Sequence, residues 1–220
     1  MFILTTWALR LFGISGILGG VLFICGDLSY NHIPGSAASP AVKMSKMPAS
    51  RLFTAGTLGL FGCWLYTLAA MHVYLAFRPA GEIYAFILLL AFAAVMISFG
   101  ISHTAYFSIA AGARAAASTG SDPEAGAQLG STLFKRLVNI TYVPVAVFSL
   151  MMLYGIAAGR SLYPRWMLIF LPILLYLLKT PIVHILKGRV RELVNDSYDN
   201  LVLFVFFTVS TLVLWNGIVV

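Results

Sequence analysis

Charged side chains are scarce in this sequence of 220 residues. Asp, Glu, Lys and Arg together make up 10% of it, whereas hydrophobic residues make up 60%. A soluble domain draws roughly a quarter of its residues from the four charged types, so this chain has too few of them to cover a surface in water. The composition therefore excludes a soluble globular domain and a disordered chain, and it predicts an integral membrane protein.

Acidic residues are the scarcer of the two charged classes. The chain has 7 of them against 14 basic residues, which gives a net charge of +7. The basic residues are spread over short connections and do not gather in one patch. Because nucleic-acid binding needs a concentrated basic surface, we expect membrane lipids and no nucleic acid as partners.

Cysteine occurs only at Cys25 and Cys63. Both lie in or at the edge of apolar stretches, where an extracellular disulfide framework is not expected. We interpret them as two small buried apolar residues.

Familiar catalytic motifs are also missing. The sequence has no HExxH, CxxC or G-x-S-x-G pattern, no phosphate-binding loop and no dinucleotide fingerprint. Each of these places reactive groups at a spacing that one turn or helix can present. Any site in this chain must therefore be assembled from several segments.

Six apolar stretches have about the length that crosses a membrane. A transmembrane helix needs about 20 mainly apolar residues, and Pro, Gly, Ser and Asp divide the chain into such stretches. They do not alternate apolar and polar residues as the strands of a membrane barrel do. The predicted spans are residues 7–26, 52–77, 83–110, 137–158, 165–185 and 199–218. The sequence thus predicts one all-α transmembrane bundle of six helices over residues 1–220.

The distribution of basic residues predicts an orientation. The first, third and fifth connections hold nine of the 14 basic residues, the opposite face holds four, and Lys179 lies inside a predicted span. Connections rich in Lys and Arg tend to stay in the cytoplasm. We therefore expect both termini outside the cytoplasm.

Two prolines, Pro172 and Pro181, interrupt the fifth predicted span. Proline lacks the N–H that a helix interior uses, so we expect a kinked helix beside a cavity. The other interpretation is that these prolines are simply tolerated, as they often are in membrane helices.

Glycines at helical spacing predict close helix contacts. Gly16 and Gly20 are four residues apart on the first span, and Gly59 lies on the second. Small residues let membrane helices approach closely, either within one chain or in a homodimer. The spacing alone leaves both arrangements open.

The densest polar group follows the first predicted span and contains Asp27, Asn31 and His32. If the helix continues past Asp27, then Asp27 and Asn31 share a face and His32 lies one position round from it. If the helix stops at Gly26, these residues form turns in a loop. Both interpretations stay open from the sequence.

A second polar group lies inside the third predicted span, near the same cytoplasmic end. His103 and Tyr106 share a helix face, and Ser102 is adjacent. Ionisable groups in hydrocarbon are costly, which makes them candidates for function. As an enzyme, the chain would use His103 as acid or base, Asp27 as its orienting partner or a metal ligand, and Tyr106 as a hydrogen-bond donor. The alternative is a buried histidine bonded to a backbone carbonyl.

Other polar residues are predicted at that same depth. Asn139 and Tyr142 begin the fourth span, and His184 ends the fifth. Lys179 either reaches the interface or pairs with Asp27 or Asp199.

A metal such as zinc would need ligands from separate spans, and Asp27, His103 and His184 are the candidates. His72 lies at the opposite end of the second span. We do not expect it to join His103.

Several segments carry a resemblance to known families. They are Gly26-Asp27, Arg51-Leu52, Trp64-Leu65-Tyr66 and His72-Val73-Tyr74. This run resembles that of uncharacterised bacterial multi-pass proteins, which implies the bacterial cytoplasmic membrane. The set of Asp, Ser and three His near one face is similar to that of alkaline-ceramidase-like membrane hydrolases, which implies a zinc site. The chain lacks their closely spaced histidine pair and their seventh span.

These observations favour a bundle with a polar cavity that opens toward the cytoplasmic leaflet. Asp27, Asn31, His32, His103 and Tyr106 would line it, and it would bind a lipid-like or isoprenoid-like molecule. Whether the chain is an enzyme stays open. The alternatives are a small transporter or channel subunit, and a structural or accessory membrane protein.

Overall fold

The computed structural model describes residues 2–34, 36 and 38–216, and within these ranges the chain is helical and has no strand. This confirms the all-α prediction. The five long helices are α1 (Phe2–Asn31), α3 (Ala49–Phe77), α4 (Glu82–Ser118), α5 (Pro123–Ala157) and α8 (Gly188–Val213). The short ones are α2 (Pro40–Ser45), η1 (Arg78–Ala80), η2 (Arg165–Phe170), α6 (Pro172–Leu177) and α7 (Lys179–Ile185).

Five helices are long and apolar enough to cross a membrane: α1 from Thr6 onward, α3 continued through η1 to Ala80, α4, α5 and α8. Between 33% and 56% of each apolar window is buried inside the chain, so much of each window is exposed. The exposed side chains include large apolar ones such as Trp7, Phe53, Ile83 and Leu150. A soluble protein rarely exposes so much apolar surface, and we conclude that the chain is an integral membrane protein.

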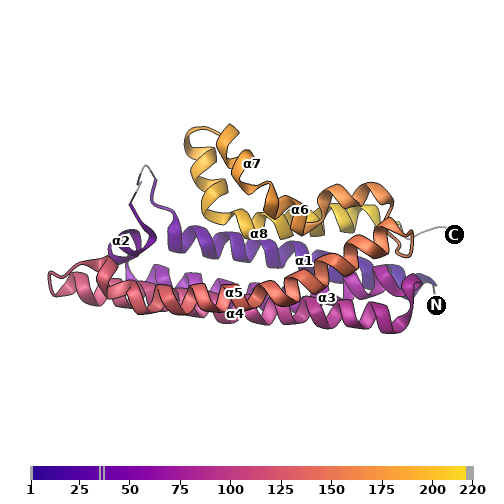
Figure 1. Ribbon diagram of the computed structural model, residues 1–220, viewed down its shortest axis with the longest axis horizontal. Coiled ribbons are helices and arrows are strands. Elements are labelled where there is room, and N and C mark those ends of the chain that lie inside the picture. The colour runs from indigo at the N-terminus through magenta and orange to yellow at the C-terminus, as the bar shows by residue number, and fades with distance from the viewer. Residues whose placement is uncertain (1, 35, 37, 217–220) are drawn as a thin grey trace.

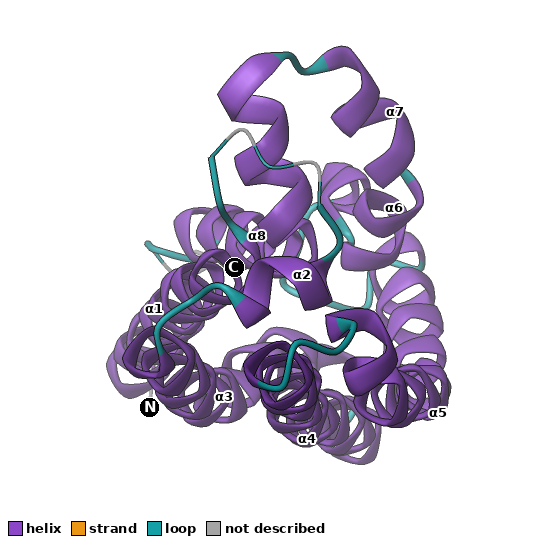
Figure 2. Cartoon of the chain, turned by 90° about the vertical axis from the view of Figure 1, so that its left-hand side faces the viewer, coloured by secondary structure: helices purple, strands orange, loops and turns teal. Residues whose placement is uncertain are grey.

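The long helices form two layers. In one layer α1 packs on α3, α3 on α4, and α4 on α5. In the other, α8 packs on α1, and α6 and α7 pack on α8 (Figure 2). The start of α1 and the end of α8 lie at the same end of the bundle (Figure 1).

The prediction of a continuous fifth span over residues 165–185 is wrong. The segment is divided into η2, α6 and α7, and the described residues contain five spanning helices instead of six. Pro172 begins α6 after Leu171, whose backbone is extended at φ −60° and ψ 132°. Pro181 lies in the first turn of α7, where its missing N–H has little cost. The expected kink is therefore a complete break.

The predicted loop over residues 111–136 is also wrong. The third predicted span ends at residue 110, but α4 continues to Ser118, because residues 110–117 are rich in alanine, the strongest helix former. The fourth begins at residue 137, but α5 starts at Pro123, where the Asp122 side chain accepts hydrogen bonds from the backbone N–H groups of Glu124 and Ala125. At 37 residues α4 is about 55 Å long. It exceeds the hydrocarbon core of roughly 30 Å, so part of α4 must lie outside that core. The α4–α5 hairpin reaches past the end of α1 (Figure 1).

Two other long helices, α1 and α8, also extend beyond their predicted bounds. The predicted spans leave residues 186–198 as a connection between the fifth and sixth spans, but α8 begins at Gly188. The first helix continues beyond residue 26 to Asn31. Both differences place polar residues on helices instead of loops.

The predicted glycine contacts lie within one chain. Gly16 faces the ring of Phe207 on α8, and Gly20 lies against Phe204 of the same helix. Gly59 on α3 lies against His103 on α4. These three glycines pack against side chains of the same chain. The homodimer stays a prediction.

The two cysteines differ in exposure. Cys63 is buried and its Sγ lies 2.9 Å from the carbonyl oxygen of Met96, but Cys25 is exposed. The interpretation of Cys25 as a buried residue is therefore wrong.

Candidate functional site

Asp27 lies at the centre of a polar cluster where α1, α4 and α8 meet. Because α1 continues to Asn31, Asp27 and Asn31 share a helix face, which is the first of the two arrangements considered for this segment. The Oδ2 atom of Asp27 accepts a hydrogen bond of 2.7 Å from Nδ2 of Asn200 on α8. Its Oδ1 atom lies 4.0 Å from Nδ1 of His103 on α4.

His103 bridges three helices. Its Nε2 atom donates a hydrogen bond of 3.0 Å to the carbonyl oxygen of Ala55 on α3, and its other ring nitrogen faces Asp27. The rings of Phe23 and Tyr30 lie 5.5 and 5.0 Å from the imidazole, centre to centre. Only 9% of the His103 side chain is exposed. His103 is therefore a buried histidine bonded to a backbone carbonyl, which is the alternative interpretation given by the sequence. It also faces a carboxylate.

Gly59 leaves the space that this imidazole occupies. A Cβ atom at this position would collide with the His103 ring, whereas a Cβ atom at Gly56 would meet only the Tyr30 hydroxyl, at 3.2 Å. We expect Gly59→Ala to lower the apparent stability by about 1–3 kcal/mol through overpacking. The measurement is the melting temperature in detergent, with Gly56→Ala as the matched control. Equal melting temperatures for the two variants would contradict the packing described here.

Tyr106 and Asn31 form the next contact of the cluster. The Tyr106 hydroxyl donates a hydrogen bond of 2.5 Å to Oδ1 of Asn31. The Tyr106 ring also lies 5.4 Å from that of Tyr30. The Tyr106 hydroxyl thus donates its proton to a residue of the protein. The predicted catalytic role needs a hydroxyl that is free to donate to a substrate.

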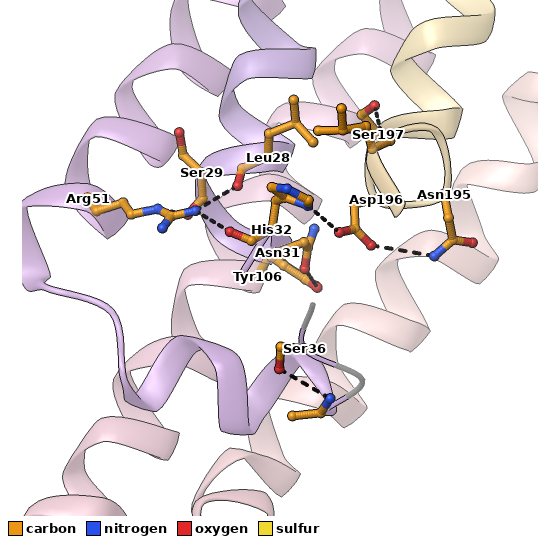
Figure 3. A network of polar contacts seen from close by, with 12 residues as sticks. Leu28, Ser29, Asn31, His32, Ser36, Arg51, Tyr106, Asn195, Asp196 and Ser197 are labelled. Carbon is orange, nitrogen blue, oxygen red and sulfur yellow. Dashed lines mark hydrogen bonds and ion pairs between the residues drawn. The ribbon is translucent and has the colours of Figure 1, made fainter. Parts of the chain in front are cut away.

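His32 lies just beyond the end of α1 and reaches toward α8. Its Nδ1 atom lies 3.3 Å from Oδ2 of Asp196 (Figure 3). The end of α1 is held by Arg51, whose guanidinium donates to the carbonyl oxygens of Leu28, Ser29 and His32 at 3.0, 2.9 and 2.6 Å (Figure 3). A cation that bonds the last carbonyls of a helix both satisfies them and complements the helix dipole.

The cluster faces a polar cavity of about 290 Å³. Lys179 of α7 lies at its rim, and its Nζ donates to Oδ1 of Asp199 at 3.1 Å, so Asp199 is its partner instead of Asp27. The lining residues are Asp27, Asn31, Pro40, His103, Tyr106, Phe134, Lys179, Asn195, Asp196, Tyr198 and Asp199.

An apolar cleft of about 400 Å³ adjoins this cavity. Lys179 and Asp199 line both hollows, so the two meet at this ion pair. The other residues of the cleft come from α4, α5 and α6, and they are Phe99, Val138, Thr141, Tyr142, Val145, Ile173, Tyr176 and Leu177. The α6 residues of the broken segment 165–185 therefore form one wall of the cleft.

The remaining predicted site residues are distributed differently. Ser102 is buried and its hydroxyl has no hydrogen-bond partner among the described residues. Tyr142 lines the apolar cleft. Asn139 and His184 are exposed, and neither lines the cavity or the cleft.

The described part of the chain brings no three His, Cys, Asp or Glu residues together in a group that could hold a metal ion. Asp27 and His103 lie close together, but His184 is exposed outside their cavity. The predicted trio is therefore not assembled in this structure.

Three residues of α8 that the sequence analysis did not assign to the site belong to it. Asp196, Asp199 and Asn200 are spaced as i, i+3 and i+4, which places them on one face of a helix. That spacing is visible in the sequence. The predicted sixth span begins at residue 199, so Asp196 falls outside it and the three residues are not assigned to one helix.

A second buried polar network lies at the opposite end, around His72. Its Nδ1 atom donates a hydrogen bond of 2.9 Å to the carbonyl oxygen of Leu9, and its Nε2 atom accepts one of 2.6 Å from the Ser210 hydroxyl. The Tyr163 hydroxyl in turn lies 2.7 Å from that of Ser210 and donates to it. Burial raises the pKa of the Tyr163 phenol, so it keeps this proton. The network is closed, fully buried at His72 and separate from His103.

Most of the chain matches a known family model. Residues 2–216 match the model of a family of unknown function (DUF6796). No curated protein and no solved structure matches the chain.

Proposed function

We propose that the chain, which belongs to the family of unknown function DUF6796, binds an amphiphilic, lipid-like molecule within the membrane. The polar head would occupy the cavity beside Asp27 and His103, and the apolar chain would lie in the adjoining cleft. The observation that carries this proposal is that the two hollows share Lys179 and Asp199. A polar and an apolar site that meet in this way match the two parts of an amphiphile.

The size and position of the two hollows support this proposal. Their volumes, about 290 and 400 Å³, together fall within the roughly 300–1,000 Å³ of ligand pockets. The cleft lies between α5 and the broken segment, and exposed apolar residues such as Leu177 and Tyr142 stand at its edge. A chain could therefore enter sideways from the lipid.

The orientation of the site follows from the basic residues. Lys43 and Arg51 lie near the polar cavity, on the connection between α1 and α3 and at the start of α3, and the projecting α4–α5 hairpin carries Arg114 and Lys135. By the preference of such residues for the cytoplasm, we propose that the cavity opens on that side of a bacterial cytoplasmic membrane. The broken segment would then complete a sixth crossing. An even number of crossings is consistent with the start of α1 and the end of α8 lying at the same end of the bundle (Figure 1).

Native mass spectrometry of the chain released from its own membrane in mild detergent tests the proposal. We expect the wild type to retain an amphiphile, and Val145→Trp to lose most of it, because the indole would fill the cleft. Val147 lies on the same helix, is 42% exposed and does not line the cleft. Val147→Trp is therefore the matched control and should retain the adduct.

The result that contradicts the proposal is equally direct. A folded wild type without any adduct, or one whose adduct survives in Val145→Trp, would remove the cleft as the binding site. The transporter and accessory hypotheses would then be favoured.

A further inference from the structure

We infer that the polar cavity takes a cationic head that donates hydrogen bonds, that is, the protonated amine of a primary or secondary alkylamine. This inference rests on the proposed function and names the class of ligand for the same site. It follows from the charges around the cavity and from two acceptors of His103 and Asp27 that face each other.

The charge of the cavity is opposite to that of the chain. The protein has only 7 acidic residues and a net charge of +7, yet Asp27, Asp196 and Asp199 all line this one cavity. Among the described residues that line the cavity, Lys179 is the only lysine or arginine, and it is paired with Asp199. A cationic head would be attracted here, and a carboxylate or phosphate head would be repelled.

His103 and Asp27 face each other without a hydrogen bond between them. Because His103 donates through Nε2 to Ala55, the Nδ1 atom of a neutral ring is an acceptor. It faces the Oδ1 of Asp27 at 4.0 Å, which is too far for a hydrogen bond. An ammonium nitrogen can sit ~2.8 Å from both atoms and donate one N–H to each.

Asn200 on α8 bonds Asp27 but is not among the residues that line the cavity. Asn200 is 7% exposed, and its Nδ2 is used by Asp27. Its Oδ1 atom has no hydrogen-bond partner within the described residues. The cavity offers the facing acceptors of His103 and Asp27 to a ligand, and a quaternary ammonium, which has no N–H, would leave them unsatisfied.

A series of four ligands with the same chain tests this inference on the purified full-length protein in maltoside detergent. The probes are dodecylamine, dodecyltrimethylammonium, dodecanol and dodecanoate, titrated by native mass spectrometry. Since a hydrogen bond to a charged group contributes more than a neutral one, we expect dodecylamine to bind at least ~10-fold more tightly than the other three. Asp27→Asn should remove this preference, whereas Glu124→Gln, which removes an exposed carboxylate that does not line this cavity, should keep it.

The outcomes separate this inference from the proposed function. Equal binding of dodecylamine and its trimethylated analogue, or tighter binding of dodecanoate, would overturn the amine inference while Val145→Trp still reports on the cleft. Binding of all four probes that Val145→Trp leaves unchanged would overturn both. Because the comparison among probes uses the wild type, it stands even if Asp27→Asn does not fold.

Discussion

Replacing His72 by alanine is expected to lower the stability of the chain more than any other single substitution discussed here, by about 3–5 kcal/mol. His72 is fully buried and bonds both Leu9 of α1 and Ser210 of α8. The substitution leaves a carbonyl and a hydroxyl buried without their partner, and it opens a cavity between three helices. The loss should appear as a marked fall in melting temperature in detergent.

The control for this prediction is His184→Ala, because His184 is exposed on α7. Its melting temperature should stay within a degree or two of that of the wild type, as is usual for a surface substitution with an effect of roughly 0.5 kcal/mol or less. If His72→Ala were as stable as this control, the network that joins α1, α3 and α8 would not hold the bundle together.

Arg51→Met is the second substitution with a large expected effect. The Arg51 guanidinium donates to three carbonyl oxygens at the end of α1. Methionine keeps an apolar stem in place but loses all three bonds, and we expect a loss of about 2–3 kcal/mol. The last turn of α1 should loosen first, and His32 should separate from Asp196 with it.

Hydrogen exchange measured on peptides that cover residues 28–34 reports this loosening directly. Arg51→Met should exchange faster there than the wild type, whereas Lys46→Ala, which alters an exposed residue on the same connection, should not. Unchanged protection in Arg51→Met would show that the end of α1 does not depend on this arginine.

The apolar spans could be predicted from the sequence because hydrophobic length is a local property. The break in residues 165–185 could not, since Pro172 and Pro181 are compatible with a kink or with a break. The choice depends on contacts elsewhere, such as the hydrogen bonds of 3.2 and 2.7 Å that Tyr176 and Tyr198 make between α6 and α8. The extension of α4 to Ser118 differs from the prediction for another reason: the polar residues that follow it are typical of a loop, whereas its alanines favour a helix.

Part of the candidate site could also be predicted. The sequence predicts one polar cavity lined by Asp27, Asn31, His32, His103 and Tyr106, and all of these except His32 line the cavity. The partners from α8 were not expected, because an acidic segment with basic neighbours is typical of a connector. Asn200 in particular is an ordinary polar residue in the sequence, and only the packing of α8 on α1 places it beside Asp27.

Photolabelling with an alkylamine that carries a diazirine in the middle of its chain tests the central claim most directly. With the head at Asp27, the reactive carbon should lie in the apolar cleft, so we expect labelled peptides that contain Val145 or Ile173, and a loss of this label in Val145→Trp. Labelling spread over the exposed apolar faces, such as that of Phe53 and Trp64, and unchanged in Val145→Trp, would contradict a binding site in this cleft.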